Sequence, residues 1–273
     1  MGEGQKHSNR VAIAGMGAIG RKIALALDQG IPGMTLTAVA VGSPEKASSF
    51  LANLKHPPQV LSLSDLAEHA DIVIECAPAS VLRELAFPVL RAGKTLVILS
   101  VGALLLNDDL IALAKACHAS IRVPTGALLG LDALIAAAEG EIHSVTMKSS
   151  KPPQGFHGAP FLVQRGIDVL GIDAPLQLYA GSAREAATGF PANLNVAIAA
   201  SLAGIGVDQT RLEIWADPTI TRNTHELVVE SDSARLTMKI ENIPSENPKT
   251  GRITAQSVIA LLRKMGGHLA IGT

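Results

Sequence analysis

The stretch that decides the fold is Val11-Ala12-Ile13-Ala14-Gly15-Met16-Gly17-Ala18-Ile19-Gly20, where small and branched apolar residues lead into a Gly-x-Gly-x-x-Gly motif. An apolar-periodic segment at residues 23–27 follows directly, so the order predicts a strand, a tight turn and a helix. Gly15 allows the sharp turn, Gly17 lets the backbone approach a pyrophosphate, and Gly20 lets the helix pack closely on the strand. The first helical turn offers free N–H groups to phosphates. The stretch predicts a dinucleotide-binding turn rather than a tight turn without a ligand, with the contact residues Gly15, Gly17, Ala18, Ile19 and Gly20.

The composition favours a soluble protein without nucleic-acid or membrane partners. The 273 residues are enough for one large or two modest domains, and 17% of them are charged. A net charge of −1 gives no electrostatic footprint for nucleic acid or an anionic membrane. No uncharged apolar run reaches the length of a membrane span, and residues 1–10 lack the hydrophobic core of a signal peptide. We therefore expect a cytoplasmic protein.

Cysteine usage agrees with that compartment and gives no metal site. Cys76 and Cys117 are too few for a disulfide framework, and neither stands in a metal-ligand spacing. Both fall in apolar segments, where we expect them to be small core residues. The histidines also form no metal-ligand spacing, so no metal is expected.

The two halves of the chain have different hydrophobic patterns. In the first half, nearly continuous apolar strands between helices predict a parallel sheet covered on both faces. After about Gly126 the strands alternate between apolar and polar residues, which predicts an antiparallel or mixed sheet with one wet face. One helix, from about Pro191 to Leu202, interrupts this second set, and a final helix at 253–264 carries enough apolar surface to dock on a core. The expected strands are 11–14, 36–41, 71–77, 95–101 and 119–123, then 142–148, 211–216 and 235–240.

The second strand lacks the acidic residue of the usual NAD fingerprint. A carboxylate at its end would bind the ribose 2′-hydroxyl, but here the strand ends Val41-Gly42-Ser43-Pro44. Glu45 comes later, at the start of the next helix, where its charge is explained more simply by stabilisation of the helix N-terminus. Without a repelling carboxylate a 2′-phosphate is not excluded, and Ser43 can donate to it, with Arg21 and Lys46 nearby. The sequence therefore leaves both NAD and NADP open as cofactors.

Several segments, in order along nearly the whole chain, together carry a family resemblance. The most specific in combination are Phe190-Pro191-x-Asn193-x-Asn195, Arg222-Asn223-x-His225 and Asn247-Pro248-Lys249-Thr250. The others are residues 74–77, 99–104, 123–133, 151–153 and 216–218. In these segments the chain resembles the L-aspartate dehydrogenase family.

The resemblance implies an α/β protein made of a Rossmann-type parallel-sheet domain and a smaller α+β domain with a mixed or antiparallel sheet. The last helix would return to the first domain, which would then comprise residues 1–125 and 248–273, with a substrate and dimerisation domain at 126–247. The implied activity is oxidation of L-aspartate to iminoaspartate with NAD or NADP, followed by hydrolysis to oxaloacetate and ammonia. The product would feed NAD biosynthesis, and the protein would be a homodimer.

His225 is the candidate catalytic residue. It shares the inward face of an alternating segment with Leu227 and Val229, so its imidazole can line a cleft while its neighbours form core. The ordinary pKa of histidine lies near neutral pH, so the ring can accept a proton from an amine or from water. Taken alone, the pattern fits a core histidine hydrogen-bonded to a backbone carbonyl better than it fits a catalytic histidine. The resemblance instead matches His225 to the catalytic histidine of the family.

Further cofactor contacts are expected from the starts of two helices and from one loop. Asn193 and Asn195 open a helix whose amides and free N–H groups can hold a cofactor carboxamide or a substrate carboxylate. The resemblance places one of them against the nicotinamide, and spacing does not choose between them. Residues 124–130 follow the fifth strand, where Ala127 offers a main-chain contact unless the segment is an ordinary connector. The resemblance also adds Ala77 to the cofactor site.

The two carboxylates of aspartate require cations or N–H clusters. The candidate cations are Lys148, Lys151, Arg222 and Lys249. For each of them, a solvated surface charge is the plainer alternative.

Two other kinds of protein also fit parts of the sequence. One is a homoserine-dehydrogenase-like or dihydrodipicolinate-reductase-like oxidoreductase, and the other is a non-catalytic NAD(H)-binding regulator that would not need His225.

Overall fold

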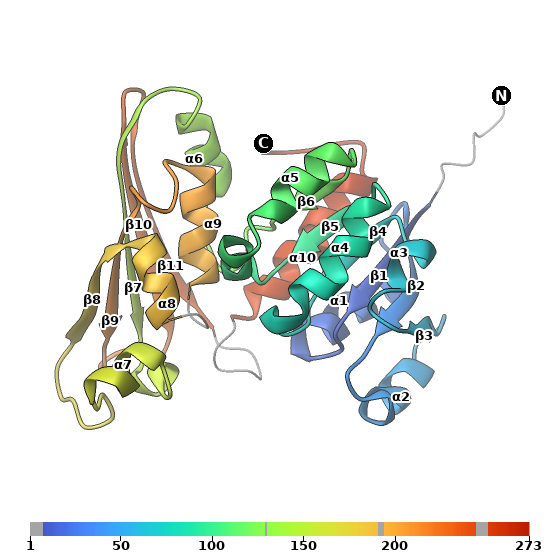
Figure 1. Ribbon diagram of the computed structural model, residues 1–273, viewed down its shortest axis with the longest axis horizontal. Helices are drawn as coiled ribbons and strands as arrows, with labels where there is room; N and C mark the ends of the chain where they lie inside the picture. Colours follow the sequence, from blue (N-terminus) through green and yellow to red (C-terminus); the bar gives the residue numbers. More distant parts are fainter. Residues whose placement is uncertain (1–7, 129, 191–193, 244–250, 273) are drawn as a thin grey trace. The chain divides into compact units, whose positions relative to one another are not determined.

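The computed structural model describes residues 8–128, 130–190, 194–243 and 251–272 (Figure 1). The chain divides into two compact units, Met1–Pro124 with Ala255–Ile271, and Thr125–Thr254 with Gly272–Thr273. Each unit contains one sheet. The α/β class expected from the sequence is confirmed.

The first unit is built on a parallel six-stranded sheet in the order β3-β2-β1-β4-β5-β6. The order reverses between β1 and β4, and in open α/β sheets ligands bind at this switch point, beyond the carboxyl ends of the strands. The short edge strand β3 was not expected from the sequence. The strands are β1 Asn9–Ala14, β2 Met34–Ala40, β3 Gln59–Leu61, β4 Ile72–Glu75, β5 Thr95–Ile98 and β6 Ser120–Arg122.

Helices of the first unit bury a stripe of apolar residues against this sheet. Helix α1 shows the pattern, since Gly20, Ile23, Ala24 and Leu27 are its buried residues, at the spacing of one helical face. Cys76 packs against the same core, whereas Cys117 is a half-buried residue at the end of α5. The helices are α1 Ala18–Gln29, α2 Pro44–Ala52, α3 Leu66–His69, η1 Ala79–Val81, α4 Leu82–Arg91, η2 Val101–Leu106 and α5 Asp109–Ala116.

The last helix, α10 (Ile253–Gly266), completes the core of the first unit. Its Ala255, Val258 and Leu262 belong to the same buried cluster as residues of β1 and α1. Gly266 lies so close to the carbonyl of Pro32 that no side chain fits there. The expected return of the final helix to the first domain is confirmed.

The second unit contains a mixed five-stranded sheet in the order β11-β10-β7-β9-β8. Only β7 and β9 run parallel, and the other neighbours are antiparallel. The sequence predicted β9 with its observed bounds, and it predicted β7 and β11 slightly short. The strands are β7 Ile142–Lys151, β8 Leu176–Ser182, β9 Arg211–Ala216, β10 Asn223–Ser231 and β11 Arg235–Asn242.

Burial alternates along the strands of this second sheet. In β10 the residues at 223, 225, 227 and 229 are buried and their neighbours are half-buried, so one face is covered. Figure 1 shows α6, α8 and α9 on one side of the sheet. Where one interrupting helix was expected, the structure has several, and the predicted start of α9 falls partly outside the described residues. The helices are α6 Leu131–Ala137, η3 Pro153–Phe156, α7 Pro160–Arg165, α8 Ala183–Gly189 and α9 Asn195–Ala203.

Candidate functional site

The glycine turn after β1 leaves room for a ligand at one position only. Gly15 has φ of 101°, and a side chain there would collide with the carbonyl of Cys76. A side chain at Gly20 would collide with the carbonyl of Gly15. At Gly17, by contrast, an added Cβ would meet no atom within 4 Å, and no side chain caps the start of α1. Exposed backbone at Gly17 and uncapped N–H groups fit the phosphates of a dinucleotide.

A buried carboxyl group joins the two loops that follow β4 and β5. Glu75, the last residue of β4, accepts hydrogen bonds from the backbone N–H of Leu99 (3.0 Å) and of Ser100 (2.7 Å) and from the Ser100 hydroxyl (3.1 Å). Burial raises the pKa of Glu75, and these hydrogen bonds oppose the rise. The expected contact Ala77 lies two residues further on and is half-buried. Glu75 therefore fixes the loops at the carboxyl ends of the strands.

The end of β2 carries hydroxyl and cationic groups and no carboxylate before Glu45. Ser43 is the N-cap residue of α2, but its side chain makes no capping hydrogen bond. Arg21 of α1 donates to the carbonyl of Met16 (3.1 Å) and to that of Lys46 (3.0 Å). Its guanidinium also lies 5.2 Å from the ring centre of Phe50. Arg21 thus connects the glycine turn to α2, the helix whose N-cap residue is Ser43.

In the second unit, five buried polar side chains gather at one end of the covered sheet face. The register pairs His225 with Ser149 and Asn223 with Asn242, and paired residues share a face. Lys151 lies two residues beyond Ser149 and so on the same face. Each of the five is less than one-tenth exposed, although buried charged and polar side chains are costly unless they have partners. Such a concentration of polar groups marks a candidate site.

His225 is held as a neutral imidazole at this position. Its Nδ1 lies 3.0 Å from the Oγ of Ser149. Burial, together with the nearby charge of Lys151, lowers the pKa of His225 to about 3. The sequence suggested a group that titrates near neutral pH, and burial overturns this, because a charged imidazolium is poorly solvated inside the protein. The ring is uncharged at neutral pH and can accept a proton.

The loop that precedes α6 lies against the same end of the sheet. The Asn242 side-chain Nδ2 donates a 2.9 Å hydrogen bond to the carbonyl of Ala127. Gly130 has φ of 73°, which disfavours any other residue, and it packs against the flexible side chain of Met238. Asn242 Oδ1 is buried and has no hydrogen-bond partner among the residues that the structure describes. Ala127, singled out separately in the sequence, therefore contacts the polar cluster to which His225 belongs.

The candidate cations are divided between the two faces of the sheet. Lys148 pairs in register with Glu226, so it points to the face opposite His225, where its Nζ lies 4.7 Å from the ring centre of Trp215. Arg222 is exposed, just before β10. Lys151 shares the face of His225. This geometry favours Lys151 over Lys148 as a substrate contact.

The two asparagine candidates and Lys249 are only partly covered by the structure. Asn195 is the first residue of α9 and is exposed. Asn193 and Lys249 lie outside the described residues. Of this group, the structure thus gives a position to Asn195 alone.

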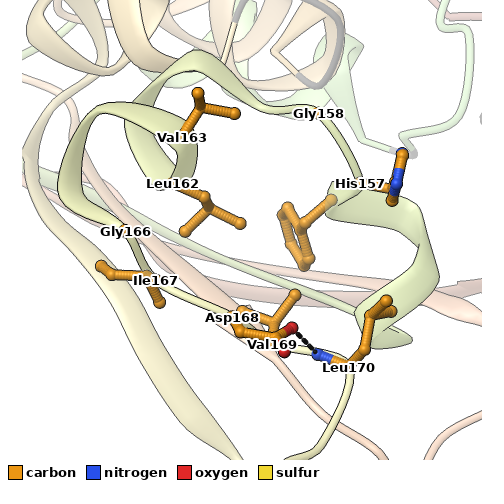
Figure 2. Close-up of a pocket in the computed structure, with 10 residues that line it drawn as sticks. His157, Gly158, Leu162, Val163, Gly166, Ile167, Asp168, Val169 and Leu170 are labelled. Carbon is orange, nitrogen blue, oxygen red and sulfur yellow. Dashed lines mark hydrogen bonds between the residues drawn. The ribbon is translucent and has the colours of Figure 1, made fainter.

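A cavity of about 300 Å³ in the second unit is lined by none of the residues of this cluster (Figure 2). Its lining is mostly apolar, and the carboxylate of Asp168 accepts a 2.8 Å hydrogen bond from the N–H of Leu170. None of the residues singled out for chemistry lines it. The lining residues are Phe156, His157, Gly158, Leu162, Val163, Gly166, Ile167, Asp168, Val169 and Leu170.

The described residues contain no group of three or more His, Cys, Asp or Glu side chains able to hold a metal ion. No helix in the described part of the chain is long and apolar enough to cross a membrane.

Comparison with known proteins covers both units. Residues 15–124 match the family model described as homoserine dehydrogenase, NAD binding domain, and residues 132–265 match aspartate dehydrogenase, C-terminal. The L-aspartate dehydrogenase of Bradyrhizobium diazoefficiens is 61% identical over 97% of this chain and 94% of its own. That of Methanocella arvoryzae is 42% identical over 97% and 99%. A crystal structure of aspartate dehydrogenase from Thermotoga maritima has a TM-score of 0.73 at 24% identity, covering 97% of this chain and all of that one (100%).

The NAD-binding match falls on the unit with the open glycine turn, so the protein is a pyridine-nucleotide-dependent dehydrogenase of two domains. The second unit distinguishes the protein from other dehydrogenases with the same nucleotide-binding sheet, because residues 132–265 match the family model described for aspartate dehydrogenase. The chain belongs to the L-aspartate dehydrogenase family.

Proposed function

We propose that the protein oxidises L-aspartate to iminoaspartate, which water then hydrolyses to oxaloacetate and ammonia. The observation that carries this proposal is the 61% identity to a named L-aspartate dehydrogenase across nearly the whole of both chains. The buried cluster of His225, Ser149 and Lys151 supports it, because it offers a proton acceptor and a cation on one face. Oxidation of the amine needs the proton acceptor, and a substrate with two carboxylates needs the cation.

The chain supplies position, charge and a base for this reaction. When bound, the cofactor supplies the hydride acceptor, C4 of its nicotinamide. His225 takes a proton from the substrate ammonium, which leaves a nitrogen lone pair to form the C=N bond as the Cα–H bond breaks. Alternatively, the same imidazole takes a proton from the water that attacks the imine.

Lys151 binds a carboxylate of the substrate in this proposal. In the free protein its charge lowers the pKa of His225 and weakens the imidazole as a base. A bound dicarboxylate brings negative charge that favours the imidazolium, so substrate binding raises this pKa. Arg222 and Lys249 remain proposed partners for the second carboxylate. Lys151 takes the place of Lys148 among the proposed substrate contacts.

The protein uses both NAD and NADP in this proposal. Ser43 stands where a carboxylate would repel a 2′-phosphate, and Arg21 reaches the same helix. The backbone at Gly17 and the N–H groups of α1 hold the pyrophosphate of either dinucleotide.

The decisive experiment measures cofactor reduction by purified protein with L-aspartate, L-glutamate and L-homoserine, each with NAD and with NADP. We expect L-aspartate to be oxidised roughly 100-fold faster than L-glutamate, because an extra methylene misplaces one carboxylate relative to the hydride acceptor. Faster oxidation of L-homoserine would favour the homoserine-dehydrogenase-like alternative. Tight NADH binding without turnover of any amino acid would favour a regulator.

A further inference from the structure

Ser149 and His225 form a buried pair that was not expected from the sequence. They stand directly opposite each other on β7 and β10, and their side chains meet at 3.0 Å, Oγ to Nδ1. Ser149 is 5% exposed and His225 is 4% exposed. A hydroxyl group is therefore committed to one particular nitrogen of the candidate base.

That contact decides which ring nitrogen can do chemistry. A neutral imidazole carries its proton on one nitrogen and a lone pair on the other, and the partner of the first sets the arrangement. Because Ser149 engages Nδ1, Nε2 is the nitrogen left for a substrate. Nε2 can accept a proton only if the hydrogen already resides on Nδ1, and the hydroxyl oxygen must then be the acceptor.

We propose that Ser149 is a positioning residue, whose hydroxyl oxygen accepts a hydrogen bond from Nδ1–H of His225 and keeps the Nε2 lone pair available as the base. The inference rests on the proposed function, which makes His225 the proton acceptor. In the proton transfer, the N–H bond of the substrate ammonium breaks and an Nε2–H bond forms. The Nδ1–H bond stays in place, so its hydrogen bond to Ser149 also stabilises the imidazolium without reorienting the ring.

The first test measures the tautomer of His225 in the unaltered protein by ¹⁵N NMR of labelled histidine. The chain has 8 histidines, so the signals that disappear in His225→Asn identify the residue. We expect a protonated Nδ1 and an unprotonated Nε2 near neutral pH. A protonated Nε2 would overturn the proposal, because the hydroxyl would then be the donor.

The second test compares Ser149→Ala, Ser149→Thr and Ser150→Ala. Misplacement of a reacting group can cost about 100-fold in rate, so Ser149→Ala should lower kcat with L-aspartate by up to about that factor while the KM for NAD stays unchanged. Ser149→Thr retains the hydroxyl and should recover most of the rate. Ser150→Ala is the matched control, since Ser150 is also buried but pairs with Thr224 on the other face.

The outcomes separate this inference from the proposed function. Normal kcat and an unchanged ¹⁵N spectrum in a folded Ser149→Ala protein would overturn it, and if that variant does not fold, the spectrum of the unaltered protein still decides. Turnover of L-aspartate together with a protonated Nε2 would refute the role of Ser149 alone. A protein with protonated Nδ1 but no activity on any amino acid would refute the proposed function and leave the hydrogen bond as inferred.

Discussion

Asn242 and Ala127 are joined by a 2.9 Å hydrogen bond from the side-chain Nδ2 to the main-chain carbonyl, across 115 residues of sequence. The bond attaches the loop before α6 to the last strand of the second sheet, beside the buried cluster around His225. It also fixes the orientation of the carboxamide, because a flipped group would place two oxygens against each other.

Asn242→Asp should destabilise the protein by about 1–3 kcal/mol, the cost of leaving buried acceptors unsatisfied. The new carboxylate oxygen would face the Ala127 carbonyl with no hydrogen between them. Thermal unfolding measures the change. Asn53→Asp is the control, because Asn53 makes an equally long bond of 2.9 Å to the Ser49 carbonyl at the exposed end of a helix. Equal losses for the two variants would contradict the prediction.

His225→Asn should lower kcat by about 10²–10⁴-fold, the usual contribution of a positioned base, with little change in NADH affinity. Steady-state kinetics and an NADH titration measure the two effects.

The stability of the protein should depend on pH through His225. The unfolded chain should bind a proton at His225 near pH 6.5, while the folded protein does not until about pH 3. Stability should therefore fall as pH drops through this window, by at most about 1.4 kcal/mol per pH unit from this residue. Denaturant unfolding at several pH values should show a shallower fall for the variant. An equally steep fall would count against the depressed pKa.

Lys151→Met should raise the KM for L-aspartate and also raise the pKa of His225, since it removes the positive charge that helps lower it. Lys148→Met is the matched control, from the same strand but the opposite face, and should change neither. Steady-state kinetics and histidine NMR provide the two measurements. In the unaltered protein, saturating succinate should likewise raise the pKa of His225. If Lys148→Met gives the larger effect on KM, the substrate lies on the other face.

Glu75→Gln should weaken NADH binding by roughly tenfold and lower stability by about 1–3 kcal/mol. The amide NH₂ cannot accept hydrogen bonds, so one or more of the donors at Leu99 and Ser100 would lose its acceptor. Fluorescence titration and thermal unfolding measure the two effects. Glu84→Gln, an exposed change on α4, should be neutral. Normal NADH affinity in Glu75→Gln would mean that these loops do not shape the cofactor site.

Ser43→Asp should weaken NADP selectively through repulsion between the new carboxylate and the 2′-phosphate. NAD should bind as well as before or better, because a carboxylate at this strand end accepts from the ribose hydroxyl. The ratio of kcat/KM for the two cofactors measures the change. Ser49→Asp, further along the same helix, is the control. Strict rejection of NADP by the unaltered protein would remove the basis for this prediction.

The fold was largely predictable from the sequence because its signals are local. Periods of apolar residues gave most strands, and the glycine turn gave the nucleotide-binding end. Strand β8 was missed because it is half-exposed and irregular, with a register shift between Gln177 and Tyr179. Helix α8 had a recognisable start, since Ser182 and Glu185 form a capping box at its N-terminus.

The site was less predictable because it depends on pairing between distant strands. Period-2 alternation places His225 on a covered face, as expected, but only the register between β7 and β10 brings Ser149 opposite it. The same register decides between Lys148 and Lys151, which a list of basic residues does not. Glu75 had a sequence signal, an acidic residue ending an apolar strand, although its acceptor role needs the neighbouring loop.

The docking of α10 on the first unit has a consequence for biosynthesis. Val258 and Leu262 complete a core whose other members begin at Val11, so the nucleotide-binding unit lacks part of its interior until residues 253–266 have left the ribosome. Nascent chains must carry that uncovered apolar surface throughout translation of the second unit, in a form suited to chaperone binding. A premature stop before residue 253 would make the exposure permanent and disable a domain encoded almost entirely upstream of the lesion.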